Sequence, residues 1–177
     1  MDENKKLNEN AIIDCVVDFL VNKPDGNWHV EKIKEKRGHQ HGPDLILTGG
    51  SHNGERFIIE CKGRSYAKSA NPINKEGWLN ALGQLVTRMN TARTIKTGET
   101  RGRINRAYKY GLGLYWVGAQ VALRRIPHEI AKTMNLYILS VYDDGFVKQW
   151  SPKDFGKEHT AEAFKRQIGR ASCRERV

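Results

Sequence analysis

The chain has 177 residues, 38% of them hydrophobic and 28% charged, which suits one compact domain with a hydrophobic core. It has no run near the roughly 18 apolar residues of a membrane span, its charged start lacks the apolar middle of a secretory signal, and its three cysteines show no pairable spacing, so we expect a cytoplasmic protein without disulfides. The formal net charge of +10 favours an anionic polymer as partner rather than a membrane.

The first predicted elements are a helix and three strands. Residues 7–22 carry apolar side chains at helical spacing, and the turn residues 23–26 end the run. Residues 28–33 alternate apolar with polar side chains, which predicts a strand with one buried face. Two short apolar runs, 44–48 and 56–62, are joined by a turn-rich segment and predict a hairpin.

The second half of the chain begins with a predicted loop over 63–74. A helix with one buried stripe follows, formed by Trp78, Leu82, Leu85 and Met89. Residues 91–106 are rich in arginine and predict a basic loop. The remaining elements are a strand at residues 110–117, a short helix at 127–134, and a hairpin whose strands, 136–142 and 146–150, flank Asp143, Asp144 and Gly145. The predicted order is α-β-β-β-α-β-α-β-β.

Three charged residues interrupt the apolar strands of the predicted hairpin. Glu60 and Lys62 are two residues apart, so they point to one face of their strand while Ile59 and Cys61 point to the other. Asp44 begins the preceding strand, directly after Pro43. A hairpin register that places Asp44 beside Glu60 gathers two carboxylates and an ammonium at one edge of the sheet.

Such a group has the chemistry that phosphodiester hydrolysis requires. Two carboxylates offer Mg²⁺ the oxygen ligands that it prefers, and a bound metal acidifies water and neutralises charge on a phosphate. Lys62 is predicted to orient or deprotonate that water, or to stabilise the developing oxyanion. The alternative is structural: Glu60 and Lys62 form an exposed ion pair worth about 0–1 kcal/mol, and Asp44 ends a loop.

These residues resemble the PD-(D/E)xK, or restriction-endonuclease-like, superfamily. Its αβββαβ core places the aspartate on the second strand and the ExK motif on the third, and the elements predicted over residues 7–117 follow that order. The resemblance implies an α/β fold with a mixed central sheet flanked by helices, followed here by a C-terminal αββ extension. It also implies metal-dependent cleavage of nucleic acid, DNA rather than RNA, with Mg²⁺ as cofactor and Mn²⁺ as a substitute.

The resemblance suggests further site residues. Relatives often add an acid from the first helix, for which Glu9 is the first candidate metal ligand and Asp14 the second. They also often carry a glutamine on the helix after ExK, which makes Gln84 a candidate for orienting a phosphate or a metal-bound water. Candidate phosphate contacts are basic residues near or after the motif, namely Arg64, Lys68, Arg88, Arg101, Arg103 and Arg106.

Two alternatives of another class remain: a non-catalytic nucleic-acid-binding module and an accessory subunit on the same fold. A homodimer also stays open.

The last ten residues, Ile168 to Val177, resemble a translated short-read sequencing adapter, because every codon of IGRASCRERV can be matched to that DNA. We therefore expect the native domain to cover residues 1–167 and the tail to pack poorly.

Overall fold

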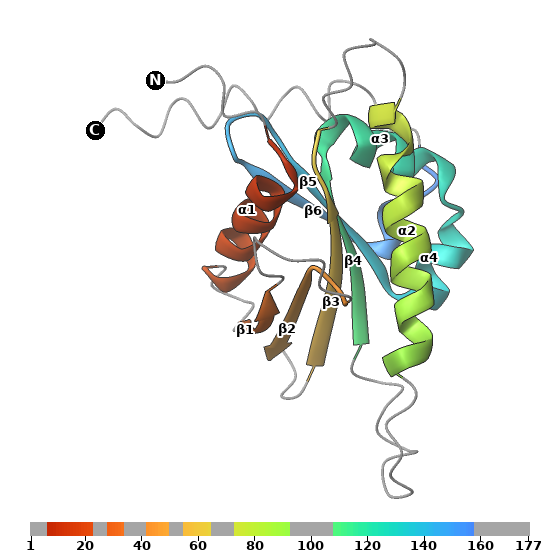
Figure 1. Ribbon diagram of the computed structural model, residues 1–177. Helices are drawn as coiled ribbons and strands as arrows, with labels where there is room; N and C mark the ends of the chain where they lie inside the picture. The colour runs from red at the N-terminus through yellow and green to blue at the C-terminus, as the bar shows by residue number, and fades with distance from the viewer. Residues whose placement is uncertain are drawn as a thin grey trace, which may run out of the picture.

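The computed structural model describes residues 7–22, 28–33, 42–49, 55–64, 73–92 and 108–157. These residues form an α/β protein in which a six-stranded mixed sheet packs against four helices (Figure 1). The expected tail, Lys68, Arg101, Arg103 and Arg106 lie outside the described residues. None of the helices within these ranges is long and apolar enough to cross a membrane.

The sheet has its strands in chain order. β1 (His29–Ile33), β2 (Leu45–Gly49) and β3 (Glu55–Lys62) are antiparallel neighbours. β3, β4 (Tyr108–Tyr115) and β5 (Leu136–Val141) are parallel, and β6 (Val147–Trp150) returns antiparallel to β5. Because Lys62 pairs with Leu114 and Leu114 with Ser140, the C-terminal ends of the three parallel strands meet at one edge of the sheet.

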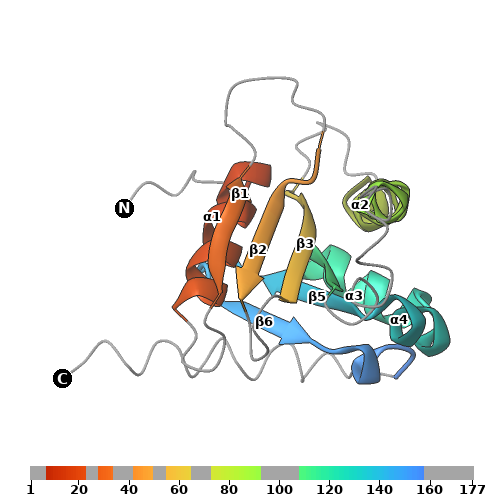
Figure 2. The same ribbon diagram turned by 90° about the horizontal axis from the view of Figure 1, so that it is seen from below.

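Helices cover both faces of the sheet. α1 (Glu9–Val21) packs on one face, while α2 (Ile73–Ala92), α3 (Trp116–Arg125) and α4 (His128–Met134) pack on the other (Figures 1 and 2). The alternation of β3 divides the core accordingly: Phe57, Ile59 and Cys61 join the cluster under α1, and Ile58 joins the cluster under α2 and α3. Glu60 and Lys62 therefore share one face, as predicted from their spacing, and this is the face on which α2 packs.

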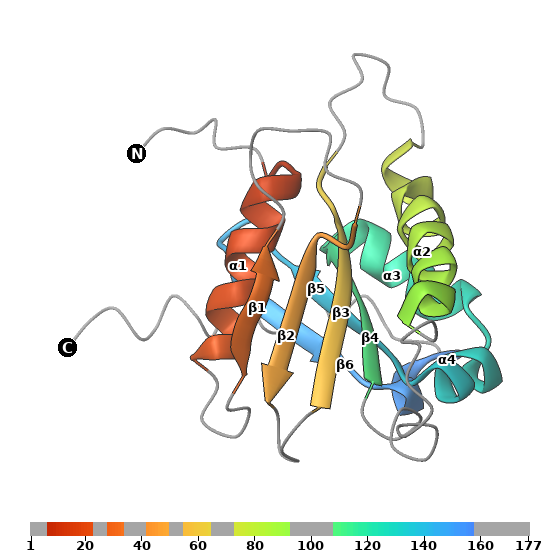
Figure 3. The ribbon, with the colours of Figure 1, turned by 60° about the horizontal axis from the view of Figure 1, so that its bottom comes forward.

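Two expectations about the elements were wrong. β1 was expected to bury one face, but all five of its residues are exposed, since it is the edge strand and a bulge between Val30 and Lys32 interrupts its alternation (Figure 3). Only Trp28, just before the strand, is buried.

The other error concerns α3, which was not predicted. β4 ends at Tyr115 rather than at residue 117, and the chain turns directly into this helix. Gly118, Ala119, Ala122 and Leu123 form its buried side. Three of these four side chains are very small, so they carry little hydrophobic signal in the sequence.

Candidate active site

The β2–β3 hairpin brings Asp44 and Glu60 together. Leu45 pairs with Ile59 in the antiparallel register, so Asp44, one residue before β2, lies opposite Glu60 and on the same face. Asp44 is 1% exposed and Glu60 is fully buried. The Cys61 backbone N–H donates a hydrogen bond of 2.8 Å to Asp44 Oδ2, which fixes that carboxylate against the end of β3.

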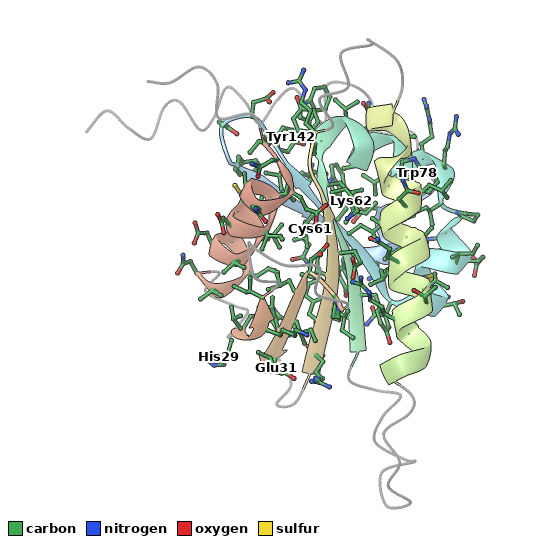
Figure 4. All side chains as sticks on the ribbon, viewed as in Figure 1. His29, Glu31, Cys61, Lys62, Trp78 and Tyr142 are labelled. Atoms are coloured by element: carbon green, nitrogen blue, oxygen red, sulfur yellow. The ribbon has the colours of Figure 1, made fainter. Side chains whose placement is uncertain are left out.

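Lys62 lies at the end of β3, between α1 and α2. Figure 4 shows it near Cys61, with Trp78 across from it on α2, while His29 and Glu31 lie at the opposite end of the sheet. Its Nζ donates a hydrogen bond of 2.9 Å to Glu9 Oε2, and the Lys62 side chain remains 22% exposed. The side chain thus stays partly exposed while the position of its ammonium is fixed from α1.

Glu9 reaches Lys62 because the N-terminus of α1 packs against the end of β3. Asn8 caps the helix by accepting a hydrogen bond from the Ala11 N–H, and the Arg64 N–H donates 2.8 Å to the Leu7 carbonyl. A Cβ at Gly63 would lie 2.4 Å from both the Asn8 carbonyl carbon and the Glu9 nitrogen. Glycine at position 63 is therefore required for this close approach.

This contact yields a stability prediction. Gly63→Ala should lower the free energy of unfolding by about 1–3 kcal/mol, because its methyl group forces the backbone of α1 away from β3. Urea unfolding measures the change. Gly83→Ala is the matched control, since a Cβ there meets nothing within 4 Å and alanine favours a helix by about 0.5–1 kcal/mol. Equal stability of Gly63→Ala and the parent would contradict the packing described here.

Arg88 provides the counter-charge for the buried acids. Its guanidinium extends from α2 and forms an ion pair with Glu60 Oε1, and its side chain is 22% exposed. Burial lowers the pKa of Arg88, and the nearby charge of Asp44 acts in the opposite direction. Arg88 was expected to contact phosphate, and the structure pairs its guanidinium with Glu60, near the charge of Asp44.

The two acids meet one requirement of a cation site. Glu60 Oε2 is buried and accepts no hydrogen bond from the described residues, so it has coordination capacity left. However, within the described part of the chain no three His, Cys, Asp or Glu side chains are grouped to hold a metal. A cation held by Asp44 and Glu60 alone would have to keep several waters, as Mg²⁺ does, since Glu9 is paired with Lys62.

A small open pocket lies beside Lys62. Its lining combines two cations, two aromatic side chains and several small residues: Lys62, Gly63, Arg64, Gly77, Trp78, Leu114, Tyr115 and Gly118. The Arg64 guanidinium carbon lies 5.4 Å from the centre of the Tyr115 ring, and the Tyr115 hydroxyl is 3.1 Å from both carboxylate oxygens of Asp143. Burial, followed by Asp143, raises the pKa of Tyr115, so its hydroxyl remains a donor.

The remaining residues that the sequence suggested are Gln84, Asp14 and Cys61. Gln84 is exposed on α2, one turn before Arg88, and Asp14 is exposed on α1. Cys61 faces the α1 core, and burial raises its thiol pKa far above the usual range, so it is a neutral core residue as expected.

Sequence reasoning missed the Glu60–Arg88 ion pair and the array of Arg64, Tyr115 and Asp143. The first had a signal in the sequence, because Arg88 continues the buried spacing of Trp78, Ala81 and Leu85 along α2. The second joins three separate elements and has no local signature.

Comparison with known proteins gave no match to a family model, a curated protein or a solved structure.

Proposed function

We propose that this protein is a Mg²⁺-dependent nuclease that hydrolyses phosphodiester bonds, with DNA preferred over RNA. The observation that carries the proposal is the placement of Asp44 opposite Glu60, with Lys62 two residues further along the same face. Two neighbouring acids in a core are costly to bury, and their position at the end of two strands is better explained by a bound cation than by stability.

Each residue has a role in this proposal. Asp44 and Glu60 hold the cation, which when bound acidifies a water molecule and neutralises charge on the phosphate. Lys62 orients or deprotonates the attacking water, or stabilises the developing oxyanion, from its partly exposed position at the sheet edge. Glu9 positions Lys62. Gln84 remains a candidate for orienting the phosphate.

The lining of the pocket supports an anionic substrate. Arg64 is held over the Tyr115 ring beside Lys62, so two cations of this pocket are available to a substrate phosphate. The element order from α1 to β4 is that of the restriction-endonuclease-like core. We propose this core, with the segments from α3 to β6 as its extension.

A non-catalytic nucleic-acid-binding module is the second candidate. The observation that favours it is the ion pair of Arg88 with Glu60, because a guanidinium neutralises the acid without any metal. In that case the acids serve the fold, and the exposed cations alone bind the phosphates.

Cleavage assays test the proposal. The purified protein is incubated with supercoiled, linear, single-stranded and branched DNA in Mg²⁺, Mn²⁺ or EDTA. We expect cleavage with either metal and none in EDTA, and the preferred DNA form then identifies the substrate. DNA binding without cleavage under every condition would favour the binding module.

A further inference from the structure

Arg88 pairs with one of the two acids that a divalent cation would bind. It comes from α2 onto the face of the sheet that carries both acids, pairs with the fully buried Glu60, and lies close enough to Asp44 for the two charges to interact. Two carboxylates and one guanidinium therefore share one small buried region.

This arrangement stabilises the two buried acids when no metal is bound. A buried carboxylate lacking a counter-charge is strongly unfavourable, and the guanidinium supplies that charge from within the chain. A metal that coordinates Glu60, even through Oε2 alone, weakens this interaction, since a dication and a guanidinium on one carboxylate repel each other.

We propose that Arg88 is a built-in counter-ion that competes with the divalent cation for Glu60, and that its release by metal makes the guanidinium available to a substrate phosphate. This inference rests on the proposed metal-dependent nuclease. Arg88 thereby couples metal binding to nucleic-acid binding.

Metal affinity without DNA is the direct test. Titration calorimetry with Mn²⁺, and separately with Ca²⁺, compares the parent with Arg88→Met and Arg88→Lys. Arg88→Met should bind the cation at least about tenfold more tightly, because a positive charge beside the ligands is gone. Arg64→Met is the matched control, since it removes an arginine that contacts the Tyr115 ring rather than Glu60, and its affinity should change much less.

Thermal unfolding gives a second readout. In EDTA, Arg88→Met should unfold at a lower temperature than the parent, because Glu60 has lost its counter-charge. Saturating Mn²⁺ should raise its Tm more than it raises that of the parent. If Arg88→Met does not fold, Arg88→Lys provides the test. A lysine keeps the charge but lacks the planar fork that pairs with Glu60, so the Arg88→Lys variant should bind metal more tightly than the parent.

The coupling to substrate is measured with Ca²⁺ and a short DNA duplex. The gain in DNA affinity on adding Ca²⁺ should be several-fold smaller in Arg88→Met than in the parent. Equal metal affinity in the parent and both Arg88 variants would overturn the counter-ion role while leaving the nuclease proposal intact. Absence of metal binding in every variant would overturn both.

Discussion

Lys62→Ala is expected to reduce DNA cleavage by about 10²–10⁴-fold while leaving metal affinity nearly unchanged. An ammonium cannot coordinate Mg²⁺, so its contribution is limited to the water, the oxyanion or the phosphate. The side chain is partly exposed, and its ion pair with Glu9 is worth about 0–1 kcal/mol, so the variant should fold normally. Single-turnover cleavage at saturating protein, together with calorimetric Mn²⁺ binding, separates the two effects.

Lys109→Ala is the matched control for this experiment. Lys109 forms an ion pair of the same length, 2.9 Å, with Glu55, has the same 22% side-chain exposure, and lies near the opposite end of the neighbouring strand. The Lys109→Ala variant should cleave DNA at a rate within a few-fold of that of the parent. Parental cleavage by Lys62→Ala would show that the catalytic assignment is wrong and that any nuclease activity comes from elsewhere.

The hairpin and its acids could be predicted from the sequence because their information is local. Apolar runs of strand length, a turn-rich connection and the two-residue period of β3 determine which face each side chain takes. The predicted pairing of β5 with β6 around Gly145 depended on the same kind of signal, and the structure confirms it. Helix boundaries at α1 and α4 agreed closely with the expected runs.

The partners of the acids could not be predicted in the same way. Glu9 meets Lys62 across 53 residues, and this contact depends on how closely α1 approaches Gly63. Arg88 was expected to contact phosphate, and the buried stripe of its helix was drawn through Leu82 and Met89, whereas the structure buries Ala81 beside Leu85. A shift of one residue on a helix turns a side chain by about 100°, which decides whether Arg88 points to solvent or toward the buried Glu60.

Asp44→Asn should abolish metal-dependent cleavage while preserving the fold. The asparagine carbonyl can still accept the hydrogen bond from the Cys61 N–H, so the substitution removes the charge and little else. Loss of one of two carboxylates should weaken Mn²⁺ binding strongly, and cleavage should fall with it. DNA binding in EDTA should hold or tighten, because a negative charge near the phosphates has been removed.

Asp44→Ala separates the charge of this residue from its structural role. Like Asp44→Asn it removes the proposed metal ligand, but it also leaves the buried Cys61 N–H without its acceptor, which should cost about 1–3 kcal/mol of unfolding free energy. The two variants should therefore be equally inactive and differ in urea stability. Parental activity in Asp44→Asn would mean that the carboxylate serves only the fold. A loss of activity in Asp44→Ala alone would then be a consequence of the missing hydrogen bond rather than of a missing metal ligand.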